Sequence, residues 1–201
     1  MSGRPDQDPL APVGGSSKFP LRAEEMGQPY FVFTKTLSVK PEVAIARILK
    51  VILSYAKPSR VGAWVPRYRE LSRTAKEIHY EVDIRQKPPG WLEQHFPRAG
   101  APRVIAARGE ATVKFSPFHW VEEWDASDLR GTFGEPSPVA YGRVRQVTTL
   151  VPWTTGTQLK KEYYQRFFTD AGRAMWDQNE KAFVALHRAG CNLLSRKLEE
   201  S

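Results

Sequence analysis

The segment FHWVEEWD, residues 118–125, combines one histidine, two tryptophans and three acidic residues within eight positions. Its alternation predicts a strand, in which Trp120, Glu122 and Trp124 share one face because successive side chains point to opposite sides. If that face points into the protein, Glu122 is a carboxyl group between two indoles. Desolvation would then raise the pKa of Glu122 and could make it a general acid or base.

Glu122 has two interpretations. In the first, Glu122 is catalytic and Arg145 assists it in steering protons on a bound molecule. In the second, Glu122 faces water or pairs with Arg143 or Arg145 on a neighbouring strand, because charged residues across a sheet usually pair. The sequence leaves both interpretations open.

Metal-capable side chains occur in two further places. His119, Glu123 and Asp125 share the other face of the same segment, but their tips would spread along about 20 Å of strand, too far for one ion. His187 and Cys191 are four residues apart with no other histidine or cysteine near them in the sequence. No serine-histidine-aspartate triad, phosphate loop or dinucleotide fingerprint is present. We therefore expect no metal and no cofactor.

Alternating and helical patterns predict the elements that must position these residues. Alternation predicts seven strands, at residues 30–39, 65–71, 78–85, 105–115, 118–125, 141–151 and 157–168. Helical spacing predicts a helix over 42–56, after Pro41, and a long last helix over 170–198. The apolar stripe expected on this last helix consists of Met175, Ala182, Phe183, Leu186, Ala189, Leu193 and Leu194.

Composition divides the 201 residues into an arm and one domain. Residues 1–29 contain five prolines and have a formal charge of −1, and their composition predicts a flexible arm. Residues 30–201 carry a formal charge of +9, so the basic character of the chain, with its net charge of +8, belongs to the predicted domain. The basic residues are scattered, which favours a basic surface that is simply solvated. The alternative is contact with an anionic membrane surface or an acidic protein, and no motif indicates nucleic-acid binding. Without an apolar run long enough to span a bilayer, and without a signal peptide, the expected location is the cytoplasm, in soluble form.

The order of the predicted elements resembles the START-like or SRPBCC superfamily, which has the helix-grip fold. Four segments carry the resemblance: TLSVKPEVAIARIL, the step Trp64-Val65-Pro66, VTTLVPWTTGTQLKKEYYQRF and AMWDQNEKAFVALHRAGCNLLSRKL. The resemblance implies an α+β fold in which a seven-stranded curved antiparallel sheet wraps around the C-terminal helix. KPPGWLEQHFP stands where the plant pathogenesis-related branch has a glycine-rich loop, which makes plant hormone binding an unlikely function.

The resemblance also implies a cavity between the sheet and the last helix. Aromatic walls with a few polar groups suit an apolar ligand. The expected ligand-binding residues are Trp64, Tyr80, Trp120, Trp124, Tyr141, Tyr163 and Trp176. The implied function is binding or transport of a hydrophobic small molecule such as a lipid, sterol, quinone or aromatic metabolite. The alternatives are a polyketide cyclase, aromatase or dehydratase using the same cavity, and an interaction module whose cavity is filled by its own side chains.

Overall fold

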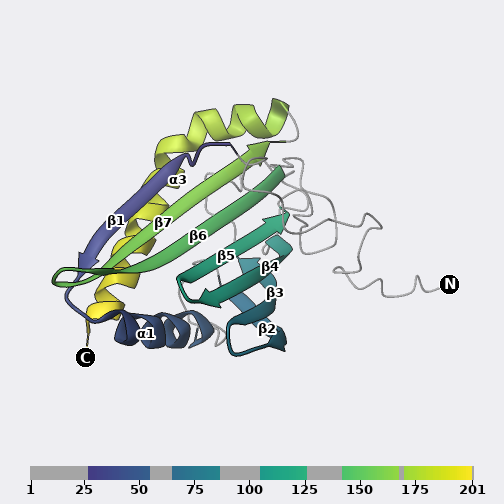
Figure 1. The fold of residues 1–201 in the computed structure, drawn as a ribbon. Coiled ribbons are helices and arrows are strands. Elements are labelled where there is room, and N and C mark those ends of the chain that lie inside the picture. Colours follow the sequence, from purple (N-terminus) through teal and green to yellow (C-terminus); the bar gives the residue numbers. More distant parts are fainter. Residues whose placement is uncertain (1–26, 55–64, 87–104, 126–141, 168–169, 201) are drawn as a thin grey trace, which may run out of the picture.

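The computed structural model describes residues 27–54, 65–86, 105–125, 142–167 and 170–200 (Figure 1). In chain order its elements are β1 (Phe31–Leu37), α1 (Pro41–Ser54), β2 (Val65–Arg73), β3 (Glu77–Gln86), β4 (Ile105–Phe115), β5 (Phe118–Asp125), β6 (Gly142–Trp153), β7 (Gly156–Phe167) and α3 (Asp170–Glu199). Each predicted strand and both predicted helices are present, with ends shifted by at most two residues. The division into an arm and a domain at residue 29 stays a prediction.

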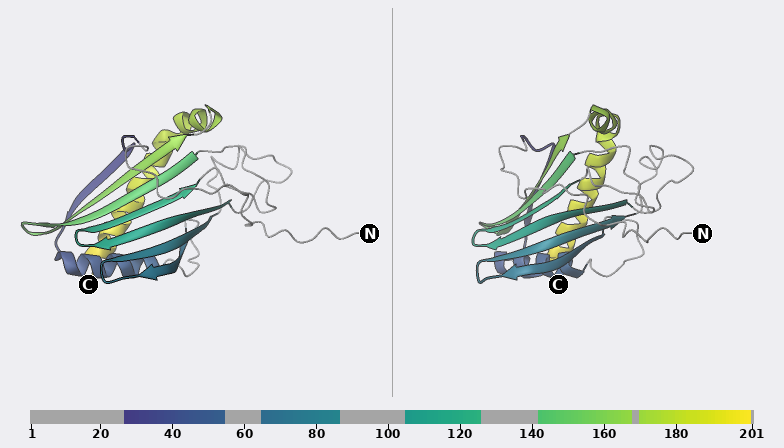
Figure 2. Two further views of the ribbon diagram at one scale, coloured as in Figure 1. Left: turned by 45° about the vertical axis from the view of Figure 1, so that its right-hand side comes forward. Right: turned by 90° about the vertical axis from the view of Figure 1, so that its right-hand side faces the viewer.

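The strands form one antiparallel sheet in the order β1-β7-β6-β5-β4-β3-β2. From β2 to β7 each strand pairs with the next along the chain, and β1 closes the series beside β7. A register shift between Glu70 and Ser72 interrupts the pairing of β2 with β3. Figure 2 shows the sheet curving around the helix, so the side that faces α3 is called the inner face below and the opposite side the outer face.

The helices lie on the inner face. Figure 1 shows α3 bent: its first turns cross the end of the sheet, and the remainder runs along the sheet towards α1. Two contacts hold the C-terminal end of α3 in place. Arg47 of α1 donates a 2.7 Å hydrogen bond to the carbonyl oxygen of Leu198, and Lys35 of β1 forms a 3.1 Å ion pair with Glu199.

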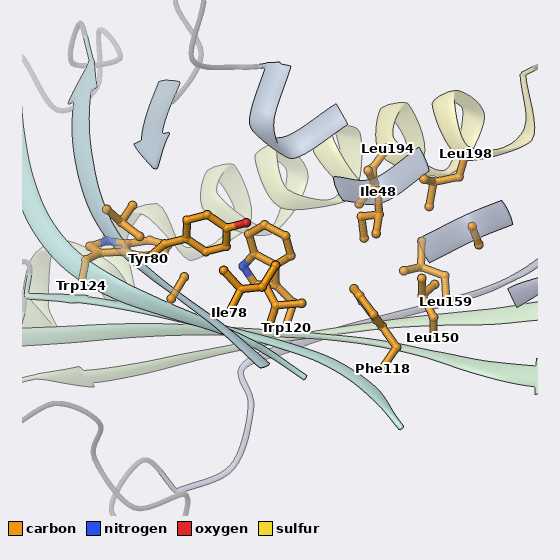
Figure 3. Packing of buried hydrophobic residues seen from close by; sticks show 14 of the residues in the cluster. Ile48, Ile78, Tyr80, Phe118, Trp120, Trp124, Leu150, Leu159, Leu194 and Leu198 are labelled. Atoms are coloured by element: carbon orange, nitrogen blue, oxygen red, sulfur yellow. The ribbon is translucent and has the colours of Figure 1, made fainter. Parts of the chain in front are cut away.

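The hydrophobic core lies between the inner face and the two helices. Strand residues such as Val82, Val113 and Leu159 meet helix residues such as Ile48 and Leu198 there, all fully buried. Figure 3 shows Leu194 and Leu198 of α3 above Leu150, Leu159 and Phe118 of the strands. Because α3 buries one long side against the sheet, it positions whatever the inner face presents.

The predicted stripe of α3 is partly wrong. Phe183 and Leu194 are buried as expected, whereas Ala182, Leu186, Ala189 and Leu193 are exposed. The buried residues of α3 are Trp176, Phe183, Cys191, Leu194, Ser195 and Leu198. The buried side of α3 thus includes Cys191 and Ser195. Because the predicted stripe was chosen by apolar character alone, it lies partly on the exposed side of the helix.

No helix in the described part of the chain has a stretch long and apolar enough to cross a membrane.

Candidate functional site

Glu122 lies in the middle of the inner face. On β5 it stands between Ala111 of β4 and Gln146 of β6, and its side chain is buried. Its Oε2 accepts a 2.9 Å hydrogen bond from the hydroxyl group of Tyr68 on β2. Trp120 and Trp124 share its side of the strand, as the alternation predicts, and both are buried.

The predicted pairing of Glu122 with an arginine is wrong, because the arginine contact belongs to its neighbour. Arg145 of β6 is in register with Glu123, and Arg145 Nη1 lies 3.4 Å from Glu123 Oε1 on the outer face. Glu123 is buried there, with 2% of its surface exposed. Glu122 and Arg145 are therefore separated by the sheet itself, and the geometry does not bring this predicted pair together.

Burial dominates the electrostatics of Glu122. Desolvation raises the pKa of the carboxyl group, against the opposing effects of the Lys161 charge and of the hydrogen bond from Tyr68. The pKa of Tyr68 is also raised, first by burial and then by the nearby carboxylate. The pair favours a neutral, hydrogen-bonded state more than the same groups would in water.

Lys161 is a second polar residue of the inner face. It lies on β7 between Thr148 of β6 and Phe33 of β1, and it is half-buried. Its Nζ lies 5.3 Å from the centre of the Tyr163 ring, within cation–π range. Its charge lowers the pKa of Glu122 and also that of His187 on α3. The ammonium group of Lys161 thus influences the ionisation of a residue of the sheet and of a residue of α3.

Tyrosine hydroxyls join the sheet to α3 on the other side of Lys161. The hydroxyl of Tyr30 lies 2.8 Å from His187 Nε2, and the hydroxyl of Tyr163 lies 3.4 Å from Cys191 Sγ. Burial lowers the pKa of His187 to about 3, with a smaller contribution from Lys161. Burial also raises the pKa of both tyrosines. At neutral pH this group is uncharged and acts through hydrogen bonds.

The aromatic residues predicted to bind a ligand fall into two groups. Tyr80 and Trp120 lie next to each other (Figure 3). Their rings stack with centres 5.9 Å apart, and the Tyr68 ring meets both edge-on. At the other end, Trp176 stacks on Phe183 with ring centres 4.4 Å apart and meets Tyr30 edge-on. Tyr163 belongs to this second group, because its ring centre lies 6.4 Å from that of Tyr30, and Trp124 is buried on the inner face. The predicted residues Trp64 and Tyr141 lie outside the described residues.

Solved structures resemble this arrangement, although a scan of family models finds no match and a search of curated proteins finds no significant relative. An aromatase/cyclase from a Streptomyces species matches with a TM-score of 0.50 and 12% identity, over 84% of this chain and 92% of that chain. A protein from Thermus thermophilus matches with a TM-score of 0.49, 10% identity and coverage of 84% and 92%. Ara h 8 matches with a TM-score of 0.47, 10% identity and coverage of 84% and 93%.

The chain has the START-like helix-grip fold. The strand order, the curved antiparallel sheet and the gripped C-terminal helix are those that the sequence resemblance implies. At 12% identity the likeness concerns the fold. The function has to be argued from the residues inside the helix grip.

Sequence reasoning missed three polar residues of the helix-grip interior, Tyr30, Tyr68 and Lys161, and it considered His187 only as a metal ligand, whereas His187 contacts Tyr30. A signal exists for Lys161, since it lies between Leu159 and Tyr163 at inward positions of an alternating strand. No local signal exists for Tyr68, because its partner Glu122 is 54 residues away.

Two surface hollows are lined by described residues, and both follow helices. One is lined by Glu42, Val43, Ala46, Arg47 and Lys50 of α1, and the other by residues of α3 including Lys181, Val184 and Arg188. Neither includes a residue of the inner face. The described residues also contain no cluster of three or more metal-capable side chains.

Proposed function

We propose that the helix-grip domain binds a hydrophobic small molecule between the inner face and α3, without changing it. The observation that carries this proposal is Glu122, a buried carboxyl group among tryptophans at the centre of the inner face. Burying a carboxyl group costs free energy, and a residue that served only packing would be better replaced by an apolar one. A polar anchor inside an aromatic wall is what orientation of a mostly apolar ligand requires.

A second candidate function is proton transfer to or from the bound molecule. Its support is the raised pKa of Glu122 together with the hydrogen bond from Tyr68, which would place a proton donor beside the ligand. The name of the Streptomyces aromatase/cyclase is in line with this chemistry on the same fold. Arg145 does not take part in this proposed proton transfer, because it lies on the outer face and contacts Glu123.

Native mass spectrometry of the full chain tests the binding proposal. The purified protein is measured as isolated and after addition of dodecanoate, cholesterol, menadione or anthraquinone, which represent the lipid, sterol, quinone and polycyclic aromatic classes. We expect a co-purified or added compound to bind with one-to-one stoichiometry. Absence of any complex with all four compounds, in protein that is empty as isolated, contradicts the proposal and favours an interaction module with a filled interior.

A matched pair of variants locates the ligand. Thr148 is buried on the inner face between Trp120 and Lys161, whereas Thr149 points to the outer face. Thr148→Leu adds volume at the proposed binding position, so we expect at least tenfold weaker binding, whereas Thr149→Leu should bind like the wild type. Equal binding by both variants would place the ligand elsewhere.

The recovered ligand distinguishes a carrier from an enzyme. A carrier returns the compound with its mass and its chromatographic retention unchanged. A dehydratase or aromatase releases a product that has lost water, and a cyclase that only closes a ring releases an isomer of the same mass with a different retention time. If a product forms, the Glu122→Gln variant should abolish it, because an amide cannot supply the proton. Product formation that persists in this variant rules out Glu122 as the proton donor.

A further inference from the structure

Lys161 is a cation in an apolar position. On β7 its neighbours at inward positions are Leu159, which is fully buried, and Tyr163, which is 4% exposed. Phe33 of β1 and Thr148 of β6 flank it across the sheet. Strand geometry thus directs the ammonium group towards α3 rather than towards the outer surface.

Other lysines on these strands have carboxylate partners. Lys160, one position earlier and on the outer face, lies 3.0 Å from Glu162, and Lys35 at the end of β1 lies 3.1 Å from Glu199. Among the described residues, Lys161 makes no ion pair within 4 Å, and its ammonium group lies over the Tyr163 ring in a cation–π contact. A half-buried ammonium group without a counterion is costly, because it has lost part of its hydration without gaining an opposite charge.

Glu122 does not fill this role. It interacts with Lys161 electrostatically but outside ion-pair distance, and its hydrogen-bond partner is Tyr68. Burial raises the pKa of Glu122, which disfavours the charged form that would neutralise the lysine. His187, the facing titratable group on α3, is neutral at physiological pH. Neither Glu122 nor His187 forms an ion pair with Lys161, which leaves its ammonium group, beside the Tyr163 ring, available to an anionic group.

We propose that Lys161 binds the carboxylate of an apolar ligand whose body lies against the aromatic residues of β3 and β5. This inference rests on the proposed function and adds to it the class of ligand, an amphiphilic monocarboxylate. The ammonium group supplies charge-assisted hydrogen bonds, which are about twice as strong as neutral ones. The stacked rings of Tyr80 and Trp120 supply the apolar contact.

Pairs of ligands that differ in charge alone test the inference. Dodecanoate is compared with dodecanamide, and 2-naphthoate with 2-naphthamide, by isothermal titration calorimetry of the full chain at pH 7.5. We expect the carboxylate of each pair to bind at least about tenfold more tightly than its amide, which is the effect of one charge-assisted contact. In the Lys161→Met variant this preference should disappear, while the amide binds as it does to the wild type.

The control is Lys160→Met, which removes the same charge one residue away on the outer face and should keep the preference. Lys161→Gln serves as a second variant in case methionine disturbs the fold, and circular dichroism checks both. A carboxylate preference that survives in a folded Lys161 variant overturns the inference. Equal affinity of wild-type protein for carboxylate and amide also overturns it, while the proposed function stands. If neither carboxylate, neither amide and none of the compounds in the mass-spectrometry test binds, the inference and the proposed function are both overturned.

Discussion

Glu122 and Glu123 show how strand geometry separates neighbouring residues of one type. They are adjacent on β5, yet Glu122 contacts Tyr68 on the inner face and Glu123 contacts Arg145 on the outer face. The guanidinium group of Arg145 compensates the burial of the Glu123 charge. The Glu122 carboxylate would instead be stabilised mainly by a hydrogen bond from the neutral hydroxyl group of Tyr68. The free energy of ionisation therefore differs between them, and only Glu122 is suited to hold or move a proton inside the helix grip.

The Glu122→Gln variant should be more stable than the wild type at pH 8. Folding raises the pKa of Glu122 above the ordinary value of 4.5, so the folded protein binds this proton more tightly than the unfolded chain does. The stability associated with this group is present below pH 4.5 and is lost as pH rises through the folded pKa. The amide keeps an acceptor for Tyr68 and avoids the buried charge, which predicts a gain of about 1–3 kcal/mol at pH 8.

Urea unfolding at pH 8 and at pH 4 measures this gain. At pH 4 the difference between Glu122→Gln and the wild type should largely vanish, because the carboxyl group is then protonated in both states. Glu180→Gln, on the exposed side of α3, is the control and should change stability at neither pH. A Glu122→Gln variant that is less stable at pH 8 than the wild type would show that the carboxylate is stabilised rather than destabilised by its surroundings.

Among the elements, β4 and β5 approach each other closely at Gly109. A Cβ atom added to Gly109 would lie 2.7 Å from the Cβ atom of Trp124 and would overlap the carbonyl oxygen of Glu123. The glycine therefore lets β5 bring its tryptophan and Glu122 to the inner face at this spacing. In contrast, a Cβ added to Gly190 on α3 meets nothing within 4 Å.

Alanine substitutions at these two glycines should have opposite effects. Gly109→Ala should destabilise the protein by about 3 kcal/mol or more, because backbone atoms cannot move away as flexible side chains can. Gly190→Ala should stabilise it by about 0.5–1 kcal/mol, since alanine has less conformational entropy to lose in a helix. Thermal unfolding of both variants checks the pair. A Gly109→Ala variant as stable as the wild type would mean that β4 and β5 separate easily.

For the whole molecule, the pH dependence of stability combines buried groups of opposite sign. Glu122 favours folding at low pH, as described above. His187 disfavours folding at low pH, because its imidazole is partly buried between α3 and the β1–β7 edge and contacts Tyr30. The helix-grip architecture is responsible, since it buries polar groups of the helix and the sheet in a shared interior.

His187 should make the protein sensitive to acid. Its pKa falls from 6.5 to about 3 on folding, so between these values the unfolded chain binds the extra proton. Stability is therefore complete above pH 6.5 and is lost as pH falls towards 3, by about 3 kcal/mol at pH 4. Denaturant unfolding from pH 7.5 to pH 4 measures this loss, which His187→Gln should reduce.

Tyr30→Phe provides the comparison for His187. This variant removes the hydrogen bond to His187 and should lower stability by about 1 kcal/mol at every pH, while leaving the loss between pH 7.5 and pH 4 in place. If His187→Gln also keeps the full wild-type loss of stability between pH 7.5 and pH 4, acid sensitivity arises from other groups.

The sequence by itself determined the order of the elements and the side of each strand on which a residue lies. Both depend on local periodicity, which backbone geometry imposes on any strand or helix. Trp120, Glu122 and Trp124 could therefore be assigned to one face in advance. Tertiary structure alone decided which groups meet across the interior.

Tyr68 reaches Glu122, Tyr30 reaches His187, and Arg145 turns to Glu123 because of sheet order, curvature and the rotation of α3. These contacts span up to 157 residues, and their free energies depend on burial that no short segment contains. The same reason explains the misplaced stripe of α3, whose inner side includes Cys191 and Ser195. What these residues can do chemically is thus a property of the closed helix grip.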